Sequence, residues 1–112
     1  MIGKYKVITL CGSTRFKDEF LRAQRDLTLQ GNIVISVGLF GHADGEYQTV
    51  VTEELKVMLD DMHKRKIDMA DEIFVINKDN YIGQSTRSEI DYALQNKKAV
   101  KYLEEPFDTM TI

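Results

Sequence analysis

Residues 5–16 read YKVITLCGSTRF, and this stretch decides the fold because two periodicities meet within it. Its first part, residues 5–11, is a mostly apolar run that stops at Gly12, as expected of a strand buried on both faces of a sheet. Apolar residues then recur every three to four positions, which predicts a helix that stops at Gly31. These helical positions are Phe16, Phe20, Ala23 and Leu27.

The same alternation continues to the end of the chain. Further apolar runs predict strands at residues 32–40, 71–77 and 98–103, with a polar loop at residues 41–48. Between them, helical spacing predicts one long helix from Val50 and another from Thr86 to about Asn96. The long helix should have one apolar face, and the last helix should bury three residues. The apolar face consists of Val51, Leu55, Met58, Met62 and Met69, and its methionines are expected in the core or in a dimer interface. The residues expected to be buried on the last helix are Ile90, Ala93 and Leu94.

This order of elements, β-α-β-α-β-α-β, predicts one α/β domain over residues 1–112. The expected fold is a three-layer, doubly wound (flavodoxin/Rossmann-like) sandwich with a mainly parallel sheet of four to five strands. Right-handed crossovers place the loops that follow the strands along one edge of such a sheet, where ligands bind. The loops GSTR (12–15) and NYIGQST (80–86) should therefore face one crevice.

Charge and composition limit the partners and the location. The net charge of −3 argues against binding of a nucleic-acid polymer. The start of the chain lacks the features of a signal peptide, and no run approaches about 18 apolar residues, so we expect a cytoplasmic protein with no membrane association. The single cysteine, Cys11, lies in an apolar run and is expected to be buried and inert. No Cys/His group has zinc spacing, and we expect no metal and no cofactor.

The first loop has the chemistry of an anion site. Gly12 allows the backbone to approach a ligand, Ser13 and Thr14 offer hydroxyl groups, and Arg15 offers a planar fork for a phosphate. The alternative is that Ser13 or Thr14 only caps the following helix while Arg15 is solvated. The residues alone leave both interpretations open.

The second loop leads to a carboxylate. Gly83 permits a turn, and Ser85 and Thr86 offer hydroxyl groups to a sugar or a phosphate. Thr86 and Glu89 have the spacing of a capping box, which would put Glu89 in the first turn of the last helix. The helix dipole there favours an ionised carboxylate, as a nucleophile requires. The alternative is that Glu89 only stabilises the helix end.

Three segments resemble the nucleoside 2-deoxyribosyltransferase-like superfamily. They are LCGSTR (10–15), MADEIFVIN (69–77) and the pattern G-x-S-T-x-x-E-I-x-Y-A-L-x-x-x-K-x-V (83–100). In size and in the first loop the chain is most similar to 2′-deoxynucleoside 5′-phosphate N-hydrolases. The resemblance extends over nearly the whole chain in the order of elements.

The resemblance implies a mechanism and a homodimer. By resemblance, Glu89 attacks the anomeric carbon of a deoxyribose, the first loop holds the nucleotide, and Ser85 and Thr86 help to bind the phosphate. The family's aspartate near the leaving base corresponds to His63 in this chain, with Asp61 shortly before it. Either residue is a candidate to assist departure of the base, and the alternative is that His63 is solvated within a charged run.

Three residues are weaker candidates for contacts with the base. Phe40 and His42 have rings that can stack on it, and Asp79 is the acidic residue nearest before Glu89 in its loop. Phe40 in the core and an exposed His42 are the alternatives.

The predicted function is cleavage or transfer of an N-glycosidic bond on a (deoxy)nucleoside 5′-monophosphate or deoxynucleoside. The alternative is a non-catalytic protein that binds a nucleotide or phosphosugar on the same fold. A third candidate is a phosphoribohydrolase of the cytokinin-activation type, which also places Gly-Thr-x-x-Glu at a helix start.

Overall fold

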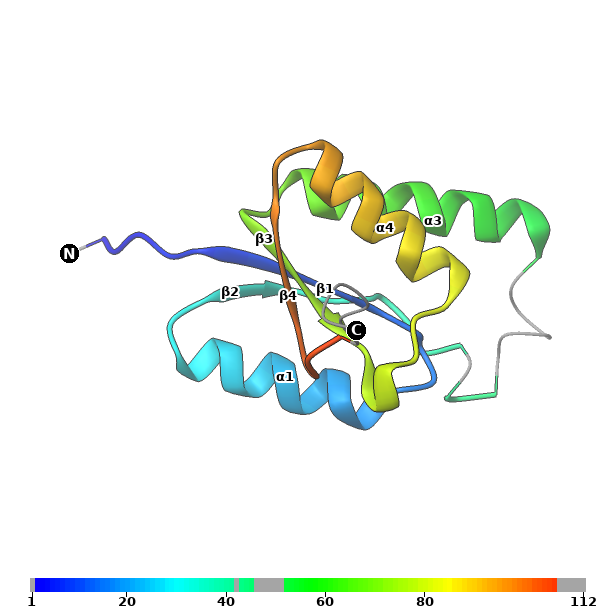
Figure 1. Cartoon of the computed structure of the whole chain (residues 1–112), viewed down its shortest axis with the longest axis horizontal. Coiled ribbons are helices and arrows are strands. Elements are labelled where there is room, and N and C mark those ends of the chain that lie inside the picture. The colour runs from blue at the N-terminus through cyan, green and yellow to red at the C-terminus, as the bar shows by residue number, and fades with distance from the viewer. Residues whose placement is uncertain (1, 42, 46–51, 107–112) are drawn as a thin grey trace, which may run out of the picture.

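The computed structural model describes residues 2–41, 43–45 and 52–106 and shows an α/β protein (Figure 1). Over these residues strands alternate with helices, as the periodicity predicts. The elements are β1 (Val7–Gly12), α1 (Lys17–Leu29), β2 (Ile33–Ile35), α3 (Glu53–Asp68), β3 (Glu72–Ile76), a 3-10 turn η1 (Lys78–Asn80), α4 (Gln84–Gln95) and β4 (Ala99–Tyr102).

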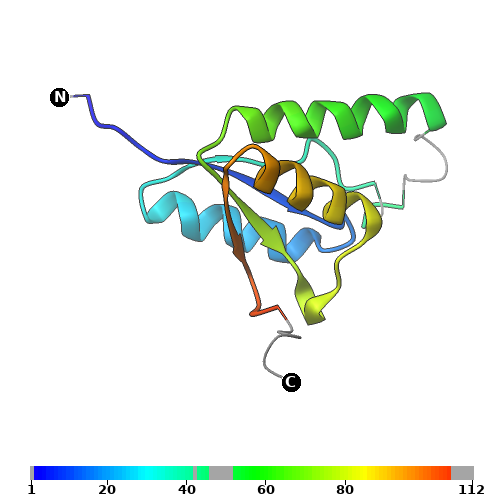
Figure 2. The ribbon, with the colours of Figure 1, turned by 45° about the horizontal axis from the view of Figure 1, so that its top comes forward.

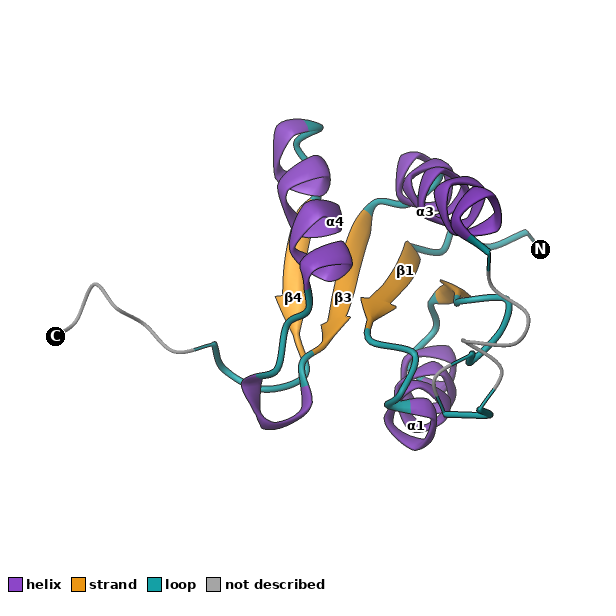
Figure 3. Ribbon diagram, turned by 90° about the vertical axis from the view of Figure 1, so that its right-hand side faces the viewer, coloured by secondary structure: helices purple, strands orange, loops and turns teal. Residues whose placement is uncertain are grey.

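The four strands form one parallel sheet in the order β2-β1-β3-β4. Helix α1 covers one face of this sheet, and α3 and α4 cover the other, so the molecule has three layers (Figures 2 and 3). This arrangement confirms the predicted doubly wound sandwich. It also makes the gap between β1 and β3 the point where successive connections turn to opposite faces.

The apolar side chains of the central strands are buried on both faces of the sheet. Leu10 packs with Phe20 and Ala23 of α1, whereas its neighbour Cys11 packs with Ile67 of α3 and Ala93 of α4. Alternate residues of a strand point to opposite faces, which explains why the run 5–11 is almost continuously apolar. The prediction that Cys11 is buried is confirmed, with 0% of its surface exposed.

The second strand and the long helix have other boundaries than predicted. The second strand covers only Ile33–Ile35 instead of residues 32–40, because β2 is an edge strand that pairs with β1 over three residues. The long helix begins at Glu53 rather than Val50 because the Thr52 side chain caps it, accepting a hydrogen bond of 3.1 Å from the Leu55 N–H.

The buried face of α3 does not include the three methionines, so the core position predicted as one alternative for them is wrong. His63 and Ile67 are buried, whereas Met58, Met62 and Met69 are 48%, 42% and 68% exposed. On α4, Ile90 and Ala93 are buried as predicted, and Leu94 is exposed. The expectation for Val51 lies outside the described residues. Among those residues, none of the helices is both long enough and apolar enough to cross a bilayer.

Gly12 joins the sheet to the first loop at a place where a side chain does not fit. It pairs with Ile76 of β3 and has a φ of +150°. A Cβ atom at this position would lie 2.8 Å from the Ile76 carbonyl oxygen, closer than real Cβ contacts. Glycine therefore permits β1 and β3 to stay paired up to the point where the chain turns toward α1.

Candidate functional site

A cleft of about 300 Å³ lies at the carboxyl ends of β1 and β3. Its walls come from the loops after β1, β2 and β3, from one face of α3 and from the start of α4. This is the position where doubly wound sheets bind ligands. The structure thus brings together the two hydroxyl-rich loops, since Ser13, Thr14, Ser85 and Thr86 all line the cleft.

Helix α3 contributes a stripe of polar side chains to the cleft. Lys56, Asp60, His63 and Lys66 line it and recur every three to four residues, so they share one face of the helix. Asp61 does not share that face. Its side chain is 71% exposed and faces Arg65, with 4.0 Å between Oδ1 and Nε. The structure therefore separates the two aspartates and places Asp60 in the cleft.

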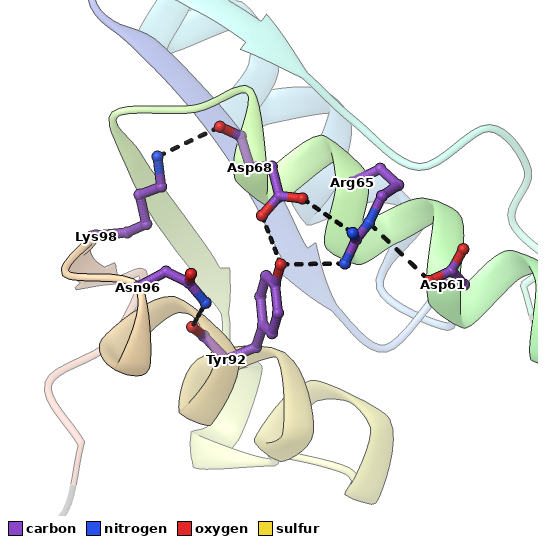
Figure 4. Close-up of polar contacts among 6 residues, drawn as sticks. All are labelled: Asp61, Arg65, Asp68, Tyr92, Asn96 and Lys98. Atoms are coloured by element: carbon purple, nitrogen blue, oxygen red, sulfur yellow. Dashed lines mark hydrogen bonds and ion pairs between the residues drawn. The ribbon is translucent and has the colours of Figure 1, made fainter.

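Away from the cleft, polar contacts join α3 to α4. We call these contacts the outer network, and they involve Arg65, Asp68 and Tyr92 (Figure 4). The Tyr92 hydroxyl donates to Asp68 Oδ1 at 2.6 Å and accepts from Arg65 at 3.0 Å. Arg65 also pairs with Asp68 at 3.3 Å. Asp61 lies at the end of this network, and its position there explains why it does not reach the cleft.

His63 and Glu89 line the cleft, and together with the fully buried Cys11 they form a group that we call the inner cluster. The Cys11 Sγ atom lies 3.4 Å from His63 Nε2, and His63 Nε2 lies 4.0 Å from Glu89 Oε1. Each residue is buried, and each comes from a different element: β1, α3 and α4. The fold thus brings together three groups that are remote in the sequence.

The Glu89 carboxyl group has an unusual environment. Burial, followed by the negative charge of Asp60, raises its pKa to about 7, and a hydrogen bond from Cys11 opposes part of this shift. Glu89 is 8% exposed, yet it lines the cleft. At neutral pH this carboxyl group is divided between its acid form and its ionised form.

His63 and Cys11 are both uncharged at neutral pH. Burial, and then the charge of Lys66, lowers the pKa of His63 to about 4, although a hydrogen bond with the Leu10 backbone opposes the shift. Burial, with Glu89 beside it, raises the pKa of the Cys11 thiol well above its ordinary value. A thiol in this state is a poor nucleophile.

The capping box predicted at Thr86 and Glu89 is not formed. Gly83 is the N-cap of α4 in extended conformation, no described side chain caps this end, and Glu89 is the sixth residue of the helix. The helix begins two residues earlier than predicted because its first turn follows directly on Gly83. Glu89 therefore lies in the second turn, where the helix dipole has little effect, and burial determines its pKa.

The first turn of α4 forms a polar end of the cleft. Gly83, Ser85 and Thr86 line it, and the backbone N–H groups of a helix start favour an anion. The Lys56 ammonium group lies 3.3 Å from Ser85 Oγ and 2.8 Å from Asp60 Oδ2. A cation and a helix start therefore meet at one end of the cleft, which suits a phosphate group.

The first loop has a different conformation from the one expected of a capped helix. The Ser13 carbonyl accepts from the Phe16 N–H at 3.1 Å in a turn before α1, and no described side chain caps this helix. Arg15 is exposed and lies outside the cleft lining. Its Nε donates to Ser13 Oγ at 3.0 Å, and its guanidinium group stacks 4.5 Å from the ring centre of Tyr81, which does line the cleft.

The candidate base-binding residues lie elsewhere. Phe40 packs against Phe20 with 5.5 Å between ring centres, so it belongs to the core beneath α1. Asp79 lies in η1, where its N–H donates to Glu104 at 2.8 Å, and it is not part of the cleft lining in the described structure. His42 lies outside the described residues. The structure therefore gives no support to Phe40 or Asp79 as contacts of a base.

Among the polar cleft residues of α3, sequence reasoning missed Lys56 and Lys66, and it chose Asp61 over its neighbour Asp60. Lys56 and Asp60 lie seven and three residues before His63, and Lys66 lies three residues after it, so all three share one face of the helix with His63. Choosing the helix face that contains His63 would have selected them. Tyr81 was missed as well, and its place beside Gly83 in the second loop was the available signal.

The chain matches no protein-family model and no curated protein.

Proposed function

We propose that the protein hydrolyses the N-glycosidic bond of a deoxynucleoside 5′-monophosphate, with Glu89 as the nucleophile. The observation that carries this proposal is the position of the Glu89 carboxyl group, which lies in a cleft at the carboxyl edge of the sheet, between two hydroxyl-rich loops. A cleft with one reactive carboxyl group and a separate polar end suits a sugar phosphate. The resemblance of three segments to deoxyribosyltransferase-like proteins points to the same chemistry.

In the proposed reaction a Glu89 carboxylate oxygen attacks C1′ of the sugar. The new C1′–O bond forms as the C1′–N bond breaks, and the base departs with the bonding electron pair and takes up a proton from solvent water. A water molecule then attacks C1′ of the covalent ester and gives its proton to solvent, as the C1′–O bond to Glu89 breaks. This step releases the sugar phosphate and restores the carboxylate. This is the two-step course of retaining glycosidases.

The environment of Glu89 is consistent with this role. A nucleophilic carboxylate must be ionised, and a pKa of about 7 leaves a large ionised fraction at neutral pH. Because burial removes water from the carboxylate, the attacking oxygen is poorly solvated before substrate binds. We expect the rate of base release to rise with pH through about 7, as Glu89 ionises.

The polar end of the cleft is the proposed phosphate site. The first turn of α4, Ser85 and Lys56 are grouped there, with Ser13 and Thr14 on the facing loop. Binding energy from the phosphate positions the sugar above Glu89, which contributes to the rate without direct contact with the reacting atoms.

We assign the α3 residues roles that differ from those expected from the sequence. His63 is neutral at pH 7 and lies 4.0 Å from Glu89 Oε1, so we assign it to positioning the nucleophile rather than to proton donation. Asp60 lines the cleft, and we assign to it the assistance of base departure that the sequence suggested for His63 or Asp61.

A second candidate function is binding of a nucleotide or phosphosugar without catalysis. The observation that favours it is the hydrogen bond between the Cys11 thiol and Glu89, which holds the carboxyl group among buried side chains. In that case Glu89 would shape the cleft and the phosphate end would provide the affinity. The two candidates differ in a single measurement, which is base release.

The homodimer and the cytoplasmic location also belong to the proposal. Val57, Met58 and Met62 on α3 are 68%, 48% and 42% exposed, and a partner molecule packed through helices would cover apolar residues of this kind.

The direct test is release of free base from the common deoxynucleoside 5′-monophosphates, measured by chromatography in the presence of a chelator. Glu89→Gln keeps the size of the side chain but cannot form the ester, and it should lower the rate by about 10³-fold or more. Asp91→Asn removes an exposed carboxylate from the same helix and serves as the matched control.

Retention of base release by Glu89→Gln would contradict the proposed nucleophile. A wild-type protein that binds monophosphates but releases no base would instead support the binding function.

A further inference from the structure

The inner cluster has a second chemical capacity, because its donor atoms converge on one point. Sγ of Cys11, Nε2 of His63 and a carboxylate oxygen of Glu89 all lie within 4.8 Å of one another. In a tetrahedral zinc site, bonds of about 2.3 Å to sulfur and 2.0–2.1 Å to nitrogen place these two atoms about 3.5 Å apart. The observed distance between Cys11 Sγ and His63 Nε2 is 3.4 Å.

The orientation of His63 also suits a metal ligand. Its ring is hydrogen-bonded to the Leu10 backbone, while Nε2 faces Cys11 and Glu89. Metal-binding histidines commonly use the second ring nitrogen in this way, since a backbone or carboxylate acceptor fixes the tautomer and the ring plane. If Nδ1 donates this hydrogen bond, the lone pair of Nε2 points toward the other two donors.

The cluster combines three protein ligands with an open side. His63 and Glu89 line the cleft of about 300 Å³, and Cys11 lies beneath them with no exposed surface. Zinc sites that keep one coordination position for water or substrate have three protein ligands. A thiolate and an imidazole select zinc over magnesium or calcium, which prefer oxygen ligands.

We propose that Cys11, His63 and Glu89 bind one Zn²⁺ ion whose fourth coordination position opens into the cleft. Binding forms the S–Zn bond as the Cys11 thiol releases its proton to solvent, while Glu89 binds through a carboxylate oxygen and His63 through Nε2. No local spacing in the sequence predicts this site, because its ligands come from three separate elements.

The metal site goes beyond the proposed hydrolase. Both the metal site and the proposed reaction use the Glu89 carboxylate. A carboxylate that binds Zn²⁺ cannot also attack a sugar, so the site allows the metal to act as an inhibitor. If the protein is the proposed hydrolase, Zn²⁺ should reduce base release and a chelator should restore it. The binding site itself does not depend on that activity.

The test is a titration of the metal-free 112-residue chain with Co²⁺, followed by Zn²⁺. Co²⁺ bound to a thiolate gives a charge-transfer absorption band, and the chain contains a single cysteine, so this band reports on Cys11. We expect the band to saturate at one equivalent of Co²⁺ and to disappear when one equivalent of Zn²⁺ displaces it. Circular dichroism should show a folded protein throughout.

Variants then identify the ligands. Cys11→Ser, His63→Gln and Glu89→Gln should each weaken Zn²⁺ binding by about 100-fold or more, since loss even of groups around a metal site costs 10–100-fold. His42→Gln removes the other histidine of the chain and is the matched control, which should bind Zn²⁺ as tightly as the wild type. The wild-type titration tests the site even if Cys11→Ser does not fold.

Two outcomes would overturn the proposal. One is a folded wild-type protein that gives no thiolate band with Co²⁺. The other is equal affinity for Zn²⁺ in the wild type and all three ligand variants, which would identify binding at the surface. Because the titration contains no nucleotide, its failure leaves the hydrolase proposal intact, and the base-release assay with chelator tests that proposal without metal.

Discussion

Helices α3 and α4 are joined by two polar groups of opposite character. In the outer network, Arg65 and Asp68 are exposed to solvent and Tyr92 is partly buried, and opposite charges and short hydrogen bonds satisfy its members (Figure 4). The inner cluster is buried, and its histidine and carboxyl group are 4.0 Å apart with pKa values shifted in opposite directions. One pair of helices therefore has a structural contact on one side and reactive groups on the other.

This difference shows why polarity alone does not identify a functional site. Exposed ion pairs are common and contribute little to stability. Buried titratable groups with shifted pKa values in a cleft are less common, and they are the usual sign of a functional site. By this criterion the inner cluster is the better candidate, although the outer network has the more regular charge pairs.

The pH dependence of stability should distinguish the two groups most strongly. The raised pKa of Glu89 stabilises the fold below about 4.5, and this contribution is lost as pH rises to about 7. The lowered pKa of His63 acts in the opposite direction, with a contribution present above 6.5 and lost as pH falls to about 4. In the wild type the two groups therefore change the unfolding free energy with pH in opposite directions, and these changes nearly cancel between pH 4.5 and 6.5.

Glu89→Gln removes the contribution of Glu89, so the unfolding free energy should then rise with pH between pH 4.5 and 6.5. The slope should be more positive than that of the wild type by about 1.4 kcal/mol per pH unit. His63→Gln should make it more negative by a similar amount. Urea denaturation of metal-free protein at a series of pH values measures both slopes. Curves parallel to the wild type for both variants would contradict the assigned pKa shifts.

The neighbouring aspartates of α3 provide the next comparison, since Asp60 lines the cleft and Asp61 faces the outer network. If Asp60 assists the leaving base, Asp60→Asn should lower base release by about 100-fold, as loss of acid–base assistance does. Asp61→Asn should lower it at least tenfold less. Equal effects of the two substitutions, measured with the same nucleotide, would remove Asp60 from the proposed site.

The outer network should give the smallest effect. Tyr92→Phe removes the hydroxyl group that contacts Asp68 and Arg65 but keeps the ring. Because these partners are exposed, we expect a small decrease in the urea midpoint and a change of less than about twofold in base release. A large loss of base release by a folded Tyr92→Phe protein would show that the two groups are coupled.

The fold was predictable because it depends on periodicity. The residues of β1 alternate between two apolar layers, and the stripe at Phe20 and Ala23 fixes the face of α1. The length of β2 was not predictable in the same way. Residues after Ile35 have strand-like sequence, but they leave the sheet, and the Ser36 carbonyl accepts a hydrogen bond from Lys66 of α3 at 3.0 Å. That contact between distant segments has no local signal.

The site was predictable in its loops and less so in its side chains. The position of Ser13, Ser85 and Glu89 follows from the rule that loops after parallel strands share one edge. The capping box failed because Gly83 starts α4 earlier than Thr86 would. The inner cluster depends on how α3 packs against β1, which brings His63 onto Cys11, and no spacing within one segment contains that information.

The most direct test of the central claim is a crystal structure of the Glu89→Gln variant with a deoxynucleoside 5′-monophosphate bound. The proposal predicts that the phosphate lies at the first turn of α4 near Ser85 and Lys56. It also predicts that C1′ lies within about 3.5 Å of the side chain at position 89, the distance of a near-attack geometry. A nucleotide bound outside the cleft, or with its sugar turned away from position 89, would contradict it.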